Sequence, residues 1–251
     1  MDMPSTSEIS EVLTKHLRLT QPPIAVAFAD RVPDGVEAWR GAIPAGCRFW
    51  QEAARRVFAT SAGDHAFCSI GQYTHNLDVT STADLTTALK VFADLTYVRE
   101  QDLAMIPVLS QKPKHVIYGP LALIPVDPEV VLLFVRADQT LILSEASQQI
   151  ENGLPPAMGR PACAIVPQAS NSGRSALSLG CCGARAYLDV LSSEVALYAI
   201  PGATLAAFAE RIAALAGANE ILSKFHRIRR EAIESGAKPT IQDSLAALQS
   251  A

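Results

Sequence analysis

The chain has 251 residues, of which 49% are hydrophobic and 18% are charged, and its formal net charge is −4. This length and apolar content are enough to bury a full core, and the acidic balance gives no electrostatic case for nucleic-acid binding. The low charged fraction leads us to expect a homo-oligomer, because a partner subunit would cover part of the surface.

The sequence also indicates a compartment. Residues 1–7 lack a positive stretch followed by an apolar one, so no secretory signal is expected. The most apolar stretch, residues 117–134, is interrupted by Pro120, Pro125 and Glu129 and is too broken to cross a bilayer. We therefore expect a cytoplasmic protein with no membrane partner, in which the five cysteines stay reduced.

Apolar periodicity and turn residues predict the elements along the chain. Ser5 and Glu8 have the spacing of a capping box before the first helix. In chain order we expect a helix over residues 9–17, a strand over 24–28, helices over 46–58 and 83–95, strands over 116–120 and 130–135, a short helix or turn over 144–150, strands over 162–166 and 195–200, and helices over 203–216 and 220–234. This order predicts an α+β fold, with a mixed sheet flanked by helices.

A break in the pattern lies at residues 152–156, where glycine and paired prolines stop any regular element. We expect one domain over residues 1–251, with possible halves 1–151 and 157–251. Each half contains two of the four well-separated cysteines. Two loosely similar halves that each contribute a pair of ligands would build one shared site.

The cysteines are the most informative residues because each lies in a short segment punctuated by glycine or proline. Cys47 lies where a helix is expected to start, which favours its thiolate, and Gly180 and Gly183 flank Cys181 and allow close approach of the backbone. No two separated cysteines form the close pair of a zinc knuckle, so the pattern favours an iron–sulfur cluster over zinc. Cys182 points away from Cys181 in an extended segment, so we interpret it as a bystander.

Two histidines lie near Cys68. In the string Asp64-His65-x-x-Cys68, the imidazole can activate the thiol as a nucleophile, although Asp64 and His65 more commonly brace such a turn. His75 can act as a second proton donor or a fourth metal ligand, but a solvated loop histidine is the more common interpretation.

Two arginines lie near the other cysteines. Arg185 follows Cys181 by four residues and can hold a substrate carboxylate or phosphate through a bidentate pair. Arg160, which precedes Cys163, can do the same. Either guanidinium can instead form a surface salt bridge.

These motifs resemble those of the family called domain of unknown function 169, or ArCR, over nearly the whole chain. The residues that carry the resemblance are Cys47-x-Phe49-Trp50, Asp64-His65-x-x-Cys68-x-Ile70-Gly71, Gly159-Arg160-Pro161-x-Cys163-Ala164-x-Val166-Pro167 and Ser178-x-Gly180-Cys181-x-Gly183-x-Arg185. Position 182 often holds an aliphatic residue in that family, which agrees with Cys182 as a bystander. The resemblance implies no established reaction, so it supports the choice of residues only.

Together these features predict a cytoplasmic enzyme with an iron–sulfur cluster of the four-iron type. The expected ligands are Cys47, Cys68 and Cys181, with Cys163 as the fourth ligand or a neighbour. An open iron would act as a Lewis acid and remove a leaving group from a small anionic substrate, as a lyase, desulfidase or dehalogenase does. Arg185 would hold that substrate and His65 would serve as acid or base. The alternatives are a four-cysteine cluster that carries electrons or senses redox state, and a metal-free cysteine-dependent enzyme or binding protein.

Overall fold

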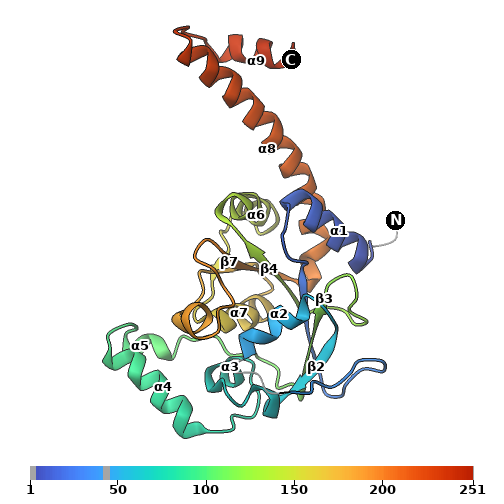
Figure 1. Cartoon of the computed structure of the whole chain (residues 1–251), viewed down its shortest axis with the longest axis vertical. Helices are drawn as coiled ribbons and strands as arrows, with labels where there is room; N and C mark the ends of the chain where they lie inside the picture. Colours follow the sequence, from blue (N-terminus) through green and yellow to red (C-terminus); the bar gives the residue numbers. More distant parts are fainter. Residues whose placement is uncertain (1–3, 42–45, 251) are drawn as a thin grey trace.

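The computed structural model of the protein describes residues 4–41 and 46–250; residues 1–3 of the N-terminal stretch lie outside this part. Within the described residues, a 7-stranded sheet has the order β2-β3-β1-β4-β7-β6-β5 (Figure 1). The strands are β1 (Ile24–Ala29), β2 (Phe58–Ser61), β3 (His115–Pro120), β4 (Val130–Val135), β5 (Ala157–Met158), β6 (Ala176–Ser178) and β7 (Ala196–Pro201). Neighbouring strands are antiparallel except β5 and β6, which are parallel, so the sheet is mixed and the α+β prediction is confirmed.

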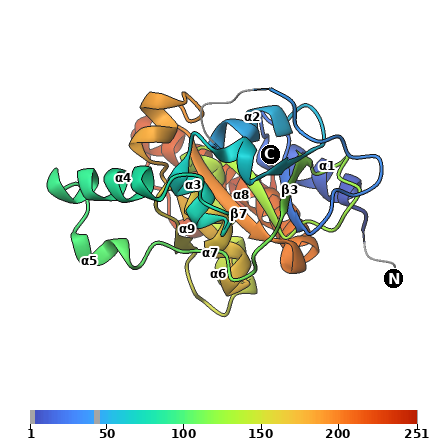
Figure 2. The ribbon, with the colours of Figure 1, turned by 90° about the horizontal axis from the view of Figure 1, so that it is seen from below.

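Helices cover both faces of the sheet because the side chains of its central strands alternate between two cores. In β4, Val131 and Leu133 pack into one core, and Leu132 and Phe134 pack into the other. The first core lies under α1 (Thr6–Leu17), α6 (Ala137–Ile150) and the start of α8 (Leu205–Glu234). The second lies under α2 (Phe49–Ala53), α3 (Ser69–Thr74) and α7 (Ile165–Ser172) (Figures 1 and 2). All the separated cysteines belong to this second side.

Two parts of the chain project from this body. The helices α4 (Thr82–Asp94) and α5 (Glu100–Leu103) form an arm beside α3, and none of their described residues is fully buried (Figure 2). The helix α8 continues beyond the sheet, and α9 (Ile241–Gln249) folds back along its far end (Figure 1). No helix in the described part of the chain combines the length and the apolar character needed to cross a bilayer.

Several predicted elements are confirmed, and others are corrected. The capping box of Ser5 and Glu8 is present at the start of α1. The strand expected over residues 162–166 is wrong, because this segment is the short helix η3 (Ala162–Ala164) followed by α7. Pro167 is compatible with that helix because it lies in the first turn, where a backbone N–H has no helical partner.

Helix lengths differ from the prediction at three other places. The helix expected over residues 46–58 ends at Ala53, and Phe58 is the first residue of β2. The short helix at residues 144–150 is the end of the longer α6. The two helices expected over 203–216 and 220–234 are one helix, α8, because tertiary packing and a long helical run outweigh the roughly 1 kcal/mol cost of Gly217.

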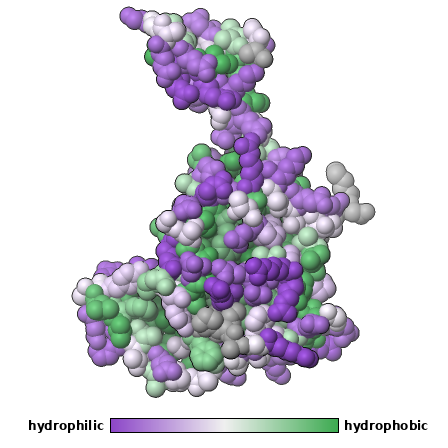
Figure 3. Space-filling view, viewed as in Figure 1, coloured by the Kyte–Doolittle hydropathy of each residue, from purple (hydrophilic) through white to green (hydrophobic). Residues whose placement is uncertain are grey.

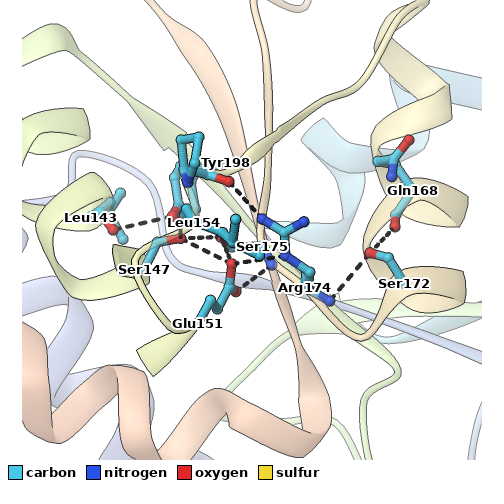
Figure 4. Close-up of polar contacts among 10 residues, drawn as sticks. Leu143, Ser147, Glu151, Leu154, Gln168, Ser172, Arg174, Ser175 and Tyr198 are labelled. Atoms are coloured by element: carbon cyan, nitrogen blue, oxygen red, sulfur yellow. Dashed lines mark hydrogen bonds and ion pairs between the residues drawn. The ribbon is translucent and has the colours of Figure 1, made fainter. Parts of the chain in front are cut away.

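The break at residues 152–156 falls in the loop between α6 and β5, and the sheet continues across it through the pairing of β4 with β7. Buried polar contacts also join the two sides (Figure 4). Glu151, at the end of α6, accepts hydrogen bonds from the Ser175 backbone N–H at 2.6 Å and from the Ser147 hydroxyl at 3.0 Å. Arg174 lies 3.7 Å from the same carboxylate. Two halves of the chain therefore share one mixed sheet; their similarity to each other stays a prediction.

Candidate functional site

A pocket of about 850 Å³ lies beside α3, between the cysteine segments and the α4–α5 arm. The described cysteines that line it are Cys47, Cys68, Cys163, Cys181 and Cys182. They come from both halves of the chain, so the fold brings together all four residues that the sequence selected as cluster ligands. We call Cys47, Cys68, Cys163 and Cys181 the thiol cluster.

Cys47 and Cys163 form the buried part of the thiol cluster. Cys47 lies in the short helix η1 (Gly46–Arg48) and Cys163 lies in η3, and these two turns contact each other. The Cys47 thiol donates a hydrogen bond to the Cys163 sulfur. The two halves of the chain therefore meet at a direct thiol–thiol contact.

Cys68 and Cys181 are half-buried, and each accepts a hydrogen bond from a backbone N–H three residues later in the chain. The Gly71 N–H lies 3.2 Å from Cys68 Sγ, and the Ala184 N–H lies 3.4 Å from Cys181 Sγ. A Cβ atom at Gly71 would lie 2.8 Å from Cys68 Sγ, so only glycine fits at this position without displacement. This contact gives a physical reason for the Cys68-x-Ile70-Gly71 motif.

The pKa values of the four thiols depend on how deeply each is buried and on the hydrogen bond between Cys47 and Cys163. Burial raises the pKa of Cys68 to about 12 and also raises the pKa of Cys181. The pKa of Cys47 is raised by its hydrogen bond to Cys163 and by burial. The pKa of Cys163 is lowered, chiefly by its side-chain hydrogen bond with Cys47. Cys47 and Cys163 therefore ionise as a pair, in which the loss of one proton makes the loss of the second harder, and burial opposes a further charge on Cys68 and Cys181.

His65 is buried behind η1 and is absent from the described pocket lining. Its Nε2 lies 2.9 Å from Thr60 Oγ1, and the Thr60 hydroxyl donates to the Val116 carbonyl at 3.2 Å. The hydroxyl therefore accepts from Nε2–H, which leaves Nδ1 unprotonated and without a partner in the described structure. Burial lowers the pKa of His65 to about 3, so the imidazole is neutral.

This geometry favours a bracing role for His65 over the expected role as acid or base. A Cβ at Gly46 would lie 2.8 Å from Nδ1, so the ring packs directly against the backbone next to Cys47. The structure does not give His65 a hydrogen bond to the Cys68 thiol; the Cys68 backbone N–H donates to the His65 carbonyl instead, at 2.9 Å. Asp64 braces the same turn by accepting from the Ser61 N–H at 2.7 Å.

His75 corrects one interpretation, because it is buried and not a solvated loop histidine. Its Nδ1 lies 3.0 Å from the Gly71 carbonyl, and its Nε2 has no partner among the described atoms. Burial lowers its pKa to about 4. The neighbouring Thr74, whose hydroxyl donates to the same Gly71 carbonyl at 3.1 Å, was missed by sequence reasoning because a lone threonine in a short helix carries no pattern.

Arg185 braces the segment that follows Cys181. Its guanidinium donates to the backbone carbonyls of Leu179, Ser192 and Val195, and it is absent from the described pocket lining. Gly180 has φ +88°, and a Cβ there would lie 2.8 Å from Leu191 and 3.3 Å from the Arg185 Nε. This glycine therefore makes room for the arginine brace and a leucine, in addition to adopting a left-handed conformation. The expected role of Arg185 in holding the substrate stays a prediction that this geometry does not favour.

Arg160 does line the pocket, together with Arg99 and Asp102 of the arm. Arg99 donates to the two carboxylate oxygens of Asp102 at 2.9 and 2.7 Å. Arg160 lies 3.9 Å from the same carboxylate, farther than a hydrogen bond, and its side chain is largely exposed. These three residues join the arm to the segment that carries Cys163.

The comparisons with known proteins give a family and no activity. The family domain of unknown function 169, described as uncharacterised ArCR, matches residues 12–211. No curated protein and no solved structure matches the chain.

Proposed function

Since the chain belongs to the family domain of unknown function 169, whose description names no reaction, we propose from the site itself that the protein is an enzyme with a cysteine-bound iron–sulfur cluster, of the four-iron type. The thiol cluster would hold it, with Cys163 as the fourth ligand or as a neighbour of three ligands. The reaction would remove a leaving group from a small anionic substrate, as in a lyase, desulfidase or dehalogenase. The observation that carries the proposal is the convergence of four thiols from two halves of the chain on one pocket.

The residues present fit such a group in two respects. Backbone N–H groups of Gly71 and Ala184 point at two of the sulfurs, and hydrogen bonds of this kind tune the potential of cysteine-bound clusters. Burial raises the pKa of Cys68 and Cys181, and the hydrogen bond to Cys163 together with burial raises the pKa of Cys47, so the thiolates would need a bound positive charge to form. Metal binding supplies that charge and releases the thiol protons.

A single metal ion fits less well. Within the described residues, no group of three or more His, Cys, Asp or Glu side chains could hold one ion. The thiolates of a cluster bind different irons and therefore lie farther apart than the ligands of one ion, so this finding is compatible with the proposal.

A bound cluster with one iron free of protein ligands would supply a Lewis acid at the floor of the pocket. The chain itself would do the rest. Arg160 would orient an anionic substrate beside the thiol cluster, and the apolar pocket wall would exclude water from it. Arg185 would keep the Cys181 loop in place through its three carbonyl contacts. We extend the proposal to the expected cytoplasmic location, since the described cysteines are all free thiols.

The test is an iron and sulfide assay, with an absorption spectrum, on protein purified without oxygen. We expect broad visible absorption and about four irons per chain. Cys47→Ser, Cys68→Ser and Cys181→Ser should each lose most of the iron. Cys182→Ser is the matched control, because its exposed thiol adjoins Cys181 and should be dispensable. A colourless, iron-free protein would overturn the proposal.

Cys163→Ser separates the leading proposal from the electron-carrier alternative. If iron is retained in this variant, three cysteines hold the cluster and one iron is open to substrate. If iron is lost, all four cysteines are ligands, which favours a carrier or redox sensor whose spectrum small ligands do not perturb.

A metal-free thiol enzyme is the second candidate, and the lowered pKa of Cys163 is the observation that favours it. A side-chain hydrogen bond with Cys47 lowers the pKa of Cys163, whereas burial raises the pKa of Cys68, which has no hydrogen bond from His65. The nucleophile would therefore be Cys163 and not Cys68. Iron-free protein in which alkylation of Cys163 abolishes activity would support this candidate.

A further inference from the structure

The wall of the pocket opposite the thiol cluster is apolar and incompletely covered. The α4–α5 arm and its loops contribute Leu89, Phe92, Tyr97 and Met105 to this wall. Phe67 and Ile70, which lie close to Cys68 at the start of α3, extend the apolar lining beside the thiol cluster. Phe67, Tyr97 and Met105 are large side chains with 69%, 59% and 76% of their surface exposed. Figure 3 shows hydrophobic surface over the arm, at the lower left. Exposed apolar surface of this kind around a cavity is typical of a ligand site.

Apart from the cysteines, three charged side chains of the described residues line the pocket. Among the described residues that line it, Arg99, Asp102 and Arg160 are the charged ones, so their formal sum is one positive charge. Arg99 donates two hydrogen bonds to the Asp102 carboxylate, whereas the Arg160 guanidinium lies 3.9 Å from that carboxylate and makes no hydrogen bond to it. Arg160 can therefore still receive an anion.

The positive charge of Arg160 lies between the segment that carries Cys163 and the α4–α5 arm, since its guanidinium reaches to 3.9 Å from Asp102 of α5. Arg160 is separated from Cys163 by only Pro161, which caps η3, and Ala162, which is its first residue. A ligand whose anionic group meets Arg160 would place that group at the side of the pocket where the Cys163 segment faces α5. Its remaining atoms would extend along the apolar wall toward α4.

We infer that the pocket binds small apolar carboxylates, with the carboxylate on Arg160 and the apolar body between α3 and the α4–α5 arm. A guanidinium binds a planar carboxylate through two parallel hydrogen bonds, which favours this anion. The volume of about 850 Å³ is within the range of pockets for such molecules. As a statement about the substrate, the inference rests on the proposed function and specifies the class of anion it acts on.

The test is calorimetric titration of the full chain, purified without oxygen, with hexanoate, octanoate and decanoate. We expect the affinity to rise about three- to fourfold for each added methylene that is buried. The alcohol and the alkyltrimethylammonium ion of equal length should bind more weakly than the carboxylate. Affinity that does not change with chain length, or that is equal for the cation, would overturn the inference.

Three variants place the ligand in this pocket. Arg160→Gln should weaken decanoate about fivefold, as expected for a partly exposed ion pair, and should remove the preference over the alcohol. Leu89→Gln should weaken decanoate and reduce the gain per methylene; α4 has no buried described residue, so this variant should fold. Arg230→Gln, on the far part of α8, is the matched control and should bind as the wild type does.

The exposed thiol of Cys182 gives a readout of location, because it lines the same pocket. Decanoate should slow its alkylation by iodoacetamide. The iron assay on the same preparation separates the two claims. Binding without iron would sustain the inference and overturn the proposed function, whereas iron without binding or protection would overturn the inference alone.

Discussion

Gly71 and Gly183 each lie beside a cysteine of the pocket, but a methyl group would meet different surroundings at the two positions. At Gly71 it would lie 2.8 Å from Cys68 Sγ, whereas at Gly183 it would lie 3.8 Å from Cys181 Sγ, an ordinary contact. We expect Gly71→Ala to lower the free energy of unfolding by about 1 kcal/mol or more, because overpacking outweighs the gain in helix propensity. It should also lower the iron content, because Cys68 is displaced.

Urea unfolding and an iron assay check this prediction, with Gly183→Ala as the matched control. If both variants retain stability and iron equally, Cys68 is not held by the close approach of Gly71.

The two buried histidines predict how stability changes with pH. Burial lowers the pKa of His65 to about 3 and that of His75 to about 4, while an unfolded histidine titrates near about 6.5. The unfolded chain therefore binds more protons below pH about 6.5, so stability is complete above that pH and falls as the pH drops toward the folded values. Between pH 7 and pH 5 each histidine should cost about 2 kcal/mol of unfolding free energy.

His65→Gln tests this relation in urea unfolding at the two pH values. The variant should be less stable at pH 7, because it disturbs the contact with Thr60, yet lose about 2 kcal/mol less on going to pH 5. His226→Gln, at an exposed position on α8, should follow the wild type. An unchanged pH dependence in His65→Gln would show that this imidazole does not titrate as a buried neutral group.

At the scale of elements, the loop between β6 and β7 depends on one side chain. Arg185 joins Leu179, Ser192 and Val195 by donating to their carbonyls, and a lysine has no planar fork with which to reach all three. We expect Arg185→Lys to lower the unfolding free energy by about 2 kcal/mol and to speed alkylation of Cys181. Arg230→Lys, on the exposed far part of α8, is the control.

The same variant separates the two roles considered for Arg185. A bracing role predicts loss of stability with decanoate binding changed little. A substrate-holding role predicts the reverse, and that result would restore the expectation from the sequence.

Sequence reasoning succeeded where a residue type carries its own pattern. Cysteines beside glycine or proline marked all four members of the thiol cluster, and alternating apolar runs marked β1, β3, β4 and β7. It failed at residues 162–166, because a short apolar run that is buried on all sides has no periodicity that distinguishes a strand from a helix. The roles expected for Arg185 and His65 stay predictions; their hydrogen bonds to the Val195 carbonyl and the Thr60 hydroxyl, which favour bracing roles, are encoded by no local pattern. The apolar α4–α5 wall was missed for the same reason, although exposed Tyr97 and Met105 are a signal once the fold is known.

At the scale of the whole molecule, the far end of α8 and α9 stand apart from the body that contains the pocket (Figures 1 and 3). The family match ends at residue 211, so most of α8 and all of α9 lie beyond it. Along this part of α8, Glu220 forms an ion pair with Arg18, at the end of α1, at 2.9 Å; the pair is exposed and therefore weak. Ile221 and Leu222 next to it have 60% and 55% of their surface exposed.

The expected homo-oligomer can be tested at the exposed far part of α8. If a second copy covers Ile221 and Leu222, replacing both with glutamate should convert the oligomer to a monomer, because burying two carboxylates in an apolar contact is costly. Light scattering after gel filtration measures the mass, at matched protein concentrations. Leu141→Glu, at an exposed leucine on α6, is the control and should keep the wild-type mass. A monomeric wild type would contradict the oligomer itself, whereas an oligomer that survives the double substitution would move the contact to another face. In either case the pocket should still bind decanoate, because all the described residues that line it belong to the body and the α4–α5 arm.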